Sequence, residues 1–164
     1  FAHQWAGIVP DVMALAKGLG SGVPVGAVLA HGAAAQVLKP GNHGSTFGGN
    51  PLAMRAGVET IRIMEEDGLL QNAADVGAHL KAELQRALGE TAGVNEVRGQ
   101  GLIIGMELDR PCGVLIDRAA EAGLLLSVTA ERVIRLVPAL ILTRAEADEI
   151  VALLTPLVQT FLSE

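Results

Sequence analysis

Tyrosine is absent from this chain, and its only aromatic side chains are three phenylalanines and one tryptophan. Because half of the residues are hydrophobic, any core must be built from aliphatic side chains. No apolar run approaches the roughly 18 residues that a membrane-spanning helix requires, so we expect no membrane partner. The length of 164 residues suits one domain or two small ones.

Positive charge and cysteine are also scarce. The net charge is −6 and the cations are not clustered, which argues against a nucleic-acid partner, because phosphate binding needs grouped cations. Cys112 is the single cysteine, so an internal disulfide is excluded and a reducing, cytoplasmic location is expected. No metal site is predicted, since the histidines show no ligand spacing. They are His3, His31, His43 and His79.

The first third of the chain alternates short apolar segments with glycine-rich loops. Residues 11–16 and 23–30 are apolar and flank the loop Gly18–Gly22. Pro24 and the valine-containing run after it disfavour a helix. We therefore predict strand, loop and strand in that order, followed by a short helix within residues 31–39.

Helical periodicity dominates the middle of the chain. Asn50 and Pro51 form a strong helix start, because asparagine caps free amides and proline is tolerated at the first helical position. The apolar stripe that follows predicts a helix to about Glu66. A second helix is predicted over residues 69–88, where leucines recur near helical spacing.

Beyond Gly89 the pattern indicates short strands and two more helices. The predicted strands are Val94–Arg98, Leu102–Leu108, Leu124–Val128 and Val133–Val137. The predicted helices are Val114–Ala122 and Ala145–Leu162. Thr143 and Glu146 have the spacing of a capping box for the last helix, and Pro156 is expected to kink or interrupt it.

Lys17 ends the apolar run that begins after Asp11 and opens the loop Gly18–Gly22. A lysine at the mouth of a buried strand is a candidate Schiff-base nucleophile, because apolar surroundings disfavour its charged form. A solvated lysine in a turn is the alternative. Nucleotide-binding motifs fit this loop poorly, since the dinucleotide fingerprint needs glycine where Val23 stands and a P-loop lysine follows its glycines.

A second candidate site lies in the segment from His43 to Pro51. Ser45 and Thr46 offer two hydroxyl groups among flexible backbone amides, just before the predicted helix. This combination suits a phosphate group, through hydrogen bonds and the positive end of the helix dipole. An ordinary loop before a capped helix is the alternative, and we interpret His43 as a structural loop residue.

Arg135 stands inside the apolar segment 133–141. A buried guanidinium needs an anionic partner, and its planar fork suits a carboxylate. The alternative is an arginine that points outward from an alternating strand. For Arg98, which precedes Gly99-Gln-Gly101, we favour a structural role.

Four segments, taken together and in this order, resemble the class-III aminotransferases, which use pyridoxal phosphate. They are residues 10–20, 44–53, 97–102 and 133–140. The resemblance extends over essentially the whole chain. It implies an α/β fold, namely the C-terminal part of a fold type I transferase. Residues 1–62 would be a remnant of the cofactor-binding large domain, and residues 63–164 the small α+β domain.

The resemblance also implies roles for single residues. Lys17 would bind the cofactor covalently and then move a proton between the substrate and the cofactor. Thr46, with Ser45 beside it, would reach the cofactor phosphate, in this family typically from the neighbouring subunit of a homodimer. Arg135 would bind the α-carboxylate of the substrate.

Residues 22–27 and 135–143 favour the branch of the family that moves an amino group from N2-acetylornithine to 2-oxoglutarate, in arginine biosynthesis. Ornithine, succinylornithine and 4-aminobutyrate stay open as alternative donors. Family members have a large N-terminal portion that this chain lacks, so we expect a fragment that is inactive alone. A truncated product that only folds and dimerises is the non-catalytic alternative.

Overall fold

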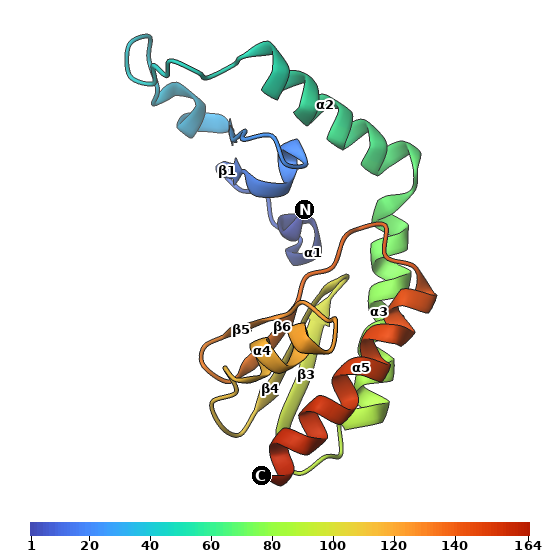
Figure 1. Cartoon of the computed structure of the whole chain (residues 1–164). Helices are drawn as coiled ribbons and strands as arrows, with labels where there is room; N and C mark the ends of the chain where they lie inside the picture. Colours follow the sequence, from blue (N-terminus) through green and yellow to red (C-terminus); the bar gives the residue numbers. More distant parts are fainter. The chain divides into compact units, whose positions relative to one another are not determined.

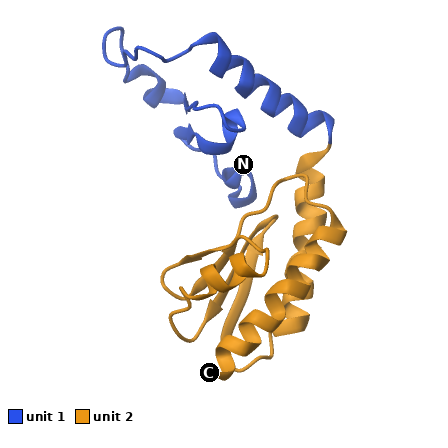
Figure 2. Cartoon of the chain, viewed as in Figure 1, with its two compact units in different colours: residues 1–67 blue, residues 68–164 orange.

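The computed structural model describes residues 1–164, and contacts within the chain divide it into two units, residues 1–67 and 68–164 (Figure 2). The helix that crosses the predicted division at residue 62 is unbroken there and belongs to unit 1. Assignment of the two units to a large and a small domain stays a prediction. No helix is both long and apolar enough to cross a membrane.

Unit 1 contains two short strands, two 3-10 helices and two α-helices (Figure 1). In chain order they are α1 (Ala2–Ala6), β1 (Val12–Leu15), η1 (Lys17–Gly20), β2 (Ala27–Ala30), η2 (Gly32–Gln36) and α2 (Pro51–Glu66). β1 and β2 pair antiparallel, with Val12 opposite Ala30. The predicted strand, loop and strand are confirmed, whereas the short helix predicted within 31–39 is a 3-10 helix.

The start of α2 has the predicted cap. The side-chain oxygen of Asn50 accepts a hydrogen bond from the Ala53 amide at 3.0 Å, and Pro51 is the first helical residue. Two small residues, Ala53 and Gly57, are buried on one face of α2, and this face packs against η1. A side-chain carbon on Gly57 would lie 3.8 Å from the Leu19 carbonyl oxygen, so the two backbones approach closely.

Unit 1 buries little apolar surface. Its strands leave Val12, Val28 and Leu29 at least half exposed. Every side chain of the buried hydrophobic cluster belongs to unit 2. The fold of unit 1 therefore depends on backbone hydrogen bonds and close helix packing more than on a core of its own.

Unit 2 is a four-stranded antiparallel sheet with three helices. Its elements are α3 (Leu69–Leu88), β3 (Val94–Gln100), β4 (Ile103–Leu108), α4 (Leu115–Glu121), β5 (Ser127–Thr129), β6 (Val133–Leu136) and α5 (Arg144–Ser163). The strand order is β3-β4-β6-β5. The predicted hairpin of β3 and β4 is observed, but its turn is at Gly101 and Leu102, because Gly99 and Gln100 continue β3 and pair with Ile104 and Ile103.

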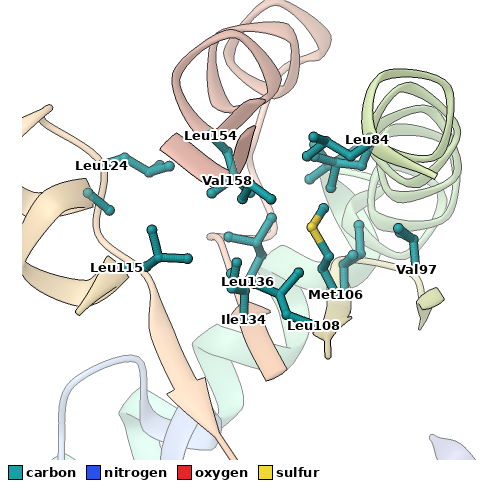
Figure 3. Close-up of a cluster of buried hydrophobic side chains, with 14 of the residues drawn as sticks. Leu84, Val97, Met106, Leu108, Leu115, Leu124, Ile134, Leu136, Leu154 and Val158 are labelled. Carbon is teal, nitrogen blue, oxygen red and sulfur yellow. The ribbon is translucent and has the colours of Figure 1, made fainter. Parts of the chain in front are cut away.

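One face of this sheet carries the core (Figure 3). Alternate strand residues face the long helices α3 and α5, which pack against each other. The buried cluster includes Leu84, Met106, Leu108, Ile134, Leu136, Leu154 and Val158. Full burial of such a side chain contributes about 1.5–3 kcal/mol. The other strand residues lie on the opposite, open face.

Two sequence predictions need correction in unit 2. The strand predicted over Leu124–Val128 is only Ser127–Thr129, because β5 is an edge strand that pairs with β6 alone over three residues. Pro156 does not interrupt α5. The turns on both sides of this proline are anchored in the core by Leu154 and Val158.

Replacement of Gly77 by alanine should destabilise unit 2. A side-chain carbon there would lie 2.1 Å from the Gly101 carbonyl oxygen, so α3 and the hairpin would have to separate. We expect a loss of about 1–3 kcal/mol in unfolding free energy, although alanine gains about 1 kcal/mol in helix propensity. The measurement is urea unfolding of the Gly77→Ala variant. Gly113→Ala is the control, because a side chain at Gly113 meets nothing within 4 Å; equal stability of both variants would contradict the close approach.

The capping box of α5 should make the free energy of unfolding decrease as the pH becomes acidic. The Thr143 amide donates to Glu146 Oε2 at 2.7 Å and the Thr143 hydroxyl at 2.8 Å, and these bonds lower the pKa of Glu146 below its usual 4.5. The stabilisation is therefore present above pH 4.5 and is lost as the pH falls through the folded-state pKa. Unfolding free energy should decline less below pH 4.5 in Glu146→Gln than in the original chain.

The matched control is Glu149→Gln, an exposed glutamate of the same helix that lies outside the capping box. The original chain and the Glu146→Gln variant share every other carboxylate, so the difference between their acid profiles isolates Glu146. Identical acid profiles for the Glu146→Gln variant and the original chain would contradict the prediction.

Candidate functional site

Lys17 is the first residue of η1, and Ala16 alone separates it from the end of β1. Its φ of 53° lies in the left-handed region, which side-chain-bearing residues rarely adopt. Two backbone hydrogen bonds hold the loop, from Leu19 to Ala16 at 3.1 Å and from Ser21 to Gly18 at 3.1 Å. The amine thus sits on a defined turn of backbone.

The Lys17 side chain is exposed, whereas the sequence suggested a position at the mouth of a buried strand. The reason is that β1 itself is not buried, and its residues alternate between exposed and intermediate. The loop is positioned instead by close packing around Gly20, where a side-chain carbon would lie 2.6 Å from Val25 Cγ1. The amine is therefore accessible to a ligand.

Ser45 and Thr46 lie in the exposed loop before α2. Ser45 Oγ accepts a hydrogen bond from the Gly48 amide at 3.2 Å, and the Asn50 side-chain amide donates to the Phe47 carbonyl at 2.9 Å. The Ser45 hydroxyl proton is not used in these bonds and can be donated to an anion. Both hydroxyl groups precede the positive end of α2, which favours negative charge.

The loop that carries Ser45 and Thr46 lies apart from the segment that carries Lys17 within unit 1. Figure 1 shows the loop before α2 (cyan) projecting away from β1 and η1 (blue). Unit 1 thus has two separate candidate binding groups: the amine of Lys17 on η1, and the hydroxyls of Ser45 and Thr46 before α2.

Arg135 is on β6 and points to the open face of the sheet, because its neighbours Ile134 and Leu136 are buried in the core. Of the two alternatives raised by the sequence, the outward-facing arginine is the one observed. Arg135 Nε donates a hydrogen bond to Ser127 Oγ at 3.1 Å. No local sequence pattern singles out Ser127; only the register that pairs β5 with β6 across a short turn places it opposite Arg135.

An open cavity of about 250 Å³ lies beside Arg135. Its walls are otherwise apolar apart from Ser127, and they include Leu125, Val137 and Ile150. No carboxylate lines this cavity. The cavity thus places an uncompensated guanidinium beside apolar walls, an arrangement that is suited to a carboxylate ligand.

Arg98 forms ion pairs with two carboxylates of the same chain. Its Nη1 pairs with Glu96 at 2.7 Å and with Glu107 across the β3–β4 ladder at 2.8 Å. Hydrogen bonds from Arg98 lower the pKa of Glu107, which keeps the pair ionised. This geometry agrees with a structural role for Arg98.

Comparison with known proteins gives the family. The family model described as aminotransferase class-III matches residues 1–158. Acetylornithine aminotransferase 1 from Bordetella pertussis is 61% identical over all 164 residues. The chain covers 42% of that relative, so it spans about two-fifths of its length.

Solved structures give the same fold. The ornithine aminotransferase from Toxoplasma gondii superposes with a TM-score of 0.90 at 34% identity, covering 99% of this chain and 40% of the other. For the N-acetylornithine aminotransferase of Stenotrophomonas maltophilia the TM-score is 0.84 at 32% identity, with 99% and 43% coverage. The chain belongs to the class-III aminotransferases and has the fold of a C-terminal portion of these proteins, as its sequence indicated.

Class-III aminotransferases use pyridoxal phosphate. The residues of this chain fit two parts of that cofactor. The accessible amine of Lys17 has the chemistry to condense with its aldehyde, and the hydroxyls of Ser45 and Thr46 at the start of α2 have the chemistry to bind its phosphate.

Proposed function

We propose that this chain provides the lysine and the carboxylate-binding arginine of an aminotransferase that moves an amino group from N2-acetylornithine to 2-oxoglutarate. The 61% identity to an acetylornithine aminotransferase over the full chain supports this choice of substrate. The unpaired Arg135 in its carboxylate-free cavity supports the use of amino-acid and oxo-acid substrates.

The cofactor, when bound, supplies the electron sink that makes the α-proton of an amino acid removable. Lys17 Nζ would bind the cofactor covalently and, once free, would move a proton between the substrate α-carbon and the cofactor. Arg135 would hold the substrate α-carboxylate and so restrict the orientation of the bound substrate. Ser45 and Thr46 would donate hydrogen bonds to the phosphate and keep the cofactor in place.

A homodimer accounts best for the separation of these groups in unit 1. The loop before α2, which carries Ser45 and Thr46, projects away from β1 and η1 (Figure 1). In a dimer they could serve the site whose lysine comes from the other subunit. Each site would then need both chains.

Two other functions have support of their own. The ornithine aminotransferase of Toxoplasma gondii matches the fold at a TM-score of 0.90, which favours ornithine as a second candidate donor. A panel of N2-acetylornithine, ornithine, succinylornithine and 4-aminobutyrate as donors to 2-oxoglutarate distinguishes the substrates. The other candidate is a non-catalytic module, which is considered because the chain covers only 42% of its relative.

Borohydride reduction in the presence of pyridoxal phosphate should fix the cofactor to Lys17. The chain has only three lysines, Lys17, Lys39 and Lys81, so peptide mapping identifies the labelled amine without ambiguity. Lys17→Ala should lose the label, and Lys39→Ala should keep it. A label on Lys39 or Lys81 contradicts the proposed role of Lys17, and no label in any protein form favours the non-catalytic module.

Mixed dimers should test the contribution of the partner subunit. Lys17→Ala and Thr46→Ala are each expected to lose cofactor trapping, by loss of the amine and by weakened phosphate binding. If the two residues act across the interface, a mixed dimer of the variants contains one site with both residues intact. Trapping should then return to about half of the original level in a 1:1 mixed dimer. No recovery would place both groups in one subunit.

A further inference from the structure

The nine arginines of this chain differ sharply in how their charge is compensated. Six of them form ion pairs with carboxylates; they are Arg55, Arg62, Arg86, Arg98, Arg110 and Arg118. Arg132, Arg135 and Arg144 form none. Among these three, Arg135 alone has its side chain held by a hydrogen bond, and the acceptor is the neutral hydroxyl of Ser127.

The register of the sheet produces this contact. Ser127 on β5 lies directly opposite Arg135 on β6, and Arg135 in turn lies opposite Gly105 on β4. Ser127 is therefore the only neighbour of Arg135 on this rung with a side chain. Its hydroxyl is fixed in turn, because Ser127 Oγ donates to the Arg135 carbonyl at 3.4 Å while it accepts from Nε at 3.1 Å.

We propose that Ser127 is a positioning residue for Arg135. By accepting the hydrogen bond from Nε, it directs the remaining guanidinium donors, Nη1 and Nη2, outward as the pair that meets a carboxylate. A guanidinium can bind a carboxylate through Nε with one Nη, or end-on through both Nη atoms. With Nε occupied, the end-on mode is selected. This inference rests on the proposed role of Arg135 in substrate binding.

A neutral acceptor is suited to this task. A carboxylate partner would neutralise the guanidinium, as Glu96 and Glu107 do for Arg98, and would compete with the substrate. A hydroxyl group restricts the rotation of the long side chain but leaves its positive charge uncompensated. Part of the entropy cost of ordering Arg135 is then met before the ligand arrives.

Side-chain NMR of the full 164-residue chain tests the proposal directly. In the original chain the Arg135 Nε–H should exchange slowly with water, and titration with 2-oxoglutarate should shift the Nη signals while the Nε–H bond to Ser127 persists. In Ser127→Ala the Nε–H should exchange about fivefold faster and 2-oxoglutarate should bind about fivefold more weakly, the effect of one lost neutral hydrogen bond. Ser127→Thr retains a hydroxyl and should restore both values.

Two controls separate positioning from a general effect on folding. The backbone amide signals of β6 report whether Ser127→Ala keeps the sheet. Ser163→Ala removes a serine hydroxyl that bonds to the Thr160 carbonyl near the end of α5, and it should change neither Arg135 signal.

The outcomes are distinguishable. If 2-oxoglutarate shifts Arg135 equally well in the original chain and in a folded Ser127→Ala variant, Ser127 has no positioning role although Arg135 still binds carboxylates. If 2-oxoglutarate does not shift Arg135 in the original chain, the proposed carboxylate role of Arg135 fails, and the role of Ser127 fails with it. Weaker binding in Ser127→Ala that Ser127→Thr restores supports the proposal.

Discussion

The alternation of side chains along β6 is the constraint on which the open face of the unit 2 sheet depends. Ile134 and Leu136 enter the core that the sheet shares with α3 and α5, so the residue between them must face the other way. Core packing thus fixes the direction of Arg135. A shift of one residue in the register would bury the guanidinium and expose both apolar neighbours, which costs far more than any surface ion pair contributes.

Unit 1 positions its candidate residues by other means. Its buried residues are small, and they allow α2 to approach η1 and allow Gly20 to approach Val25. Lys17 is placed by a left-handed backbone turn after a short strand and not by apolar walls. A strained φ at a candidate catalytic residue is a typical sign that surrounding structure holds it there.

The sequence predicted the features that depend on local chemistry. The Asn50 cap, the Thr143 and Glu146 capping box and the extent of α3 follow from short-range hydrogen bonds and periodicity, and all are observed. The predictions that failed depend on contacts between residues that are far apart in the sequence. Lys17 is exposed because neighbouring segments leave β1 uncovered. The contact between Ser127 and Arg135 depends on the register of β5 and β6, which local propensity does not specify.

The two candidate groups lie in different units, and only one of these units has a hydrophobic core. Arg135 stands on a sheet with a full hydrophobic core, whereas Lys17 belongs to a unit with only three buried residues, Gly20, Ala53 and Gly57. Substitution of an exposed lysine in unit 1 removes no contact from the core of unit 2. Loss of cofactor chemistry in such a variant, with the unfolding of unit 2 unchanged, would therefore report on the amine and not on the fold.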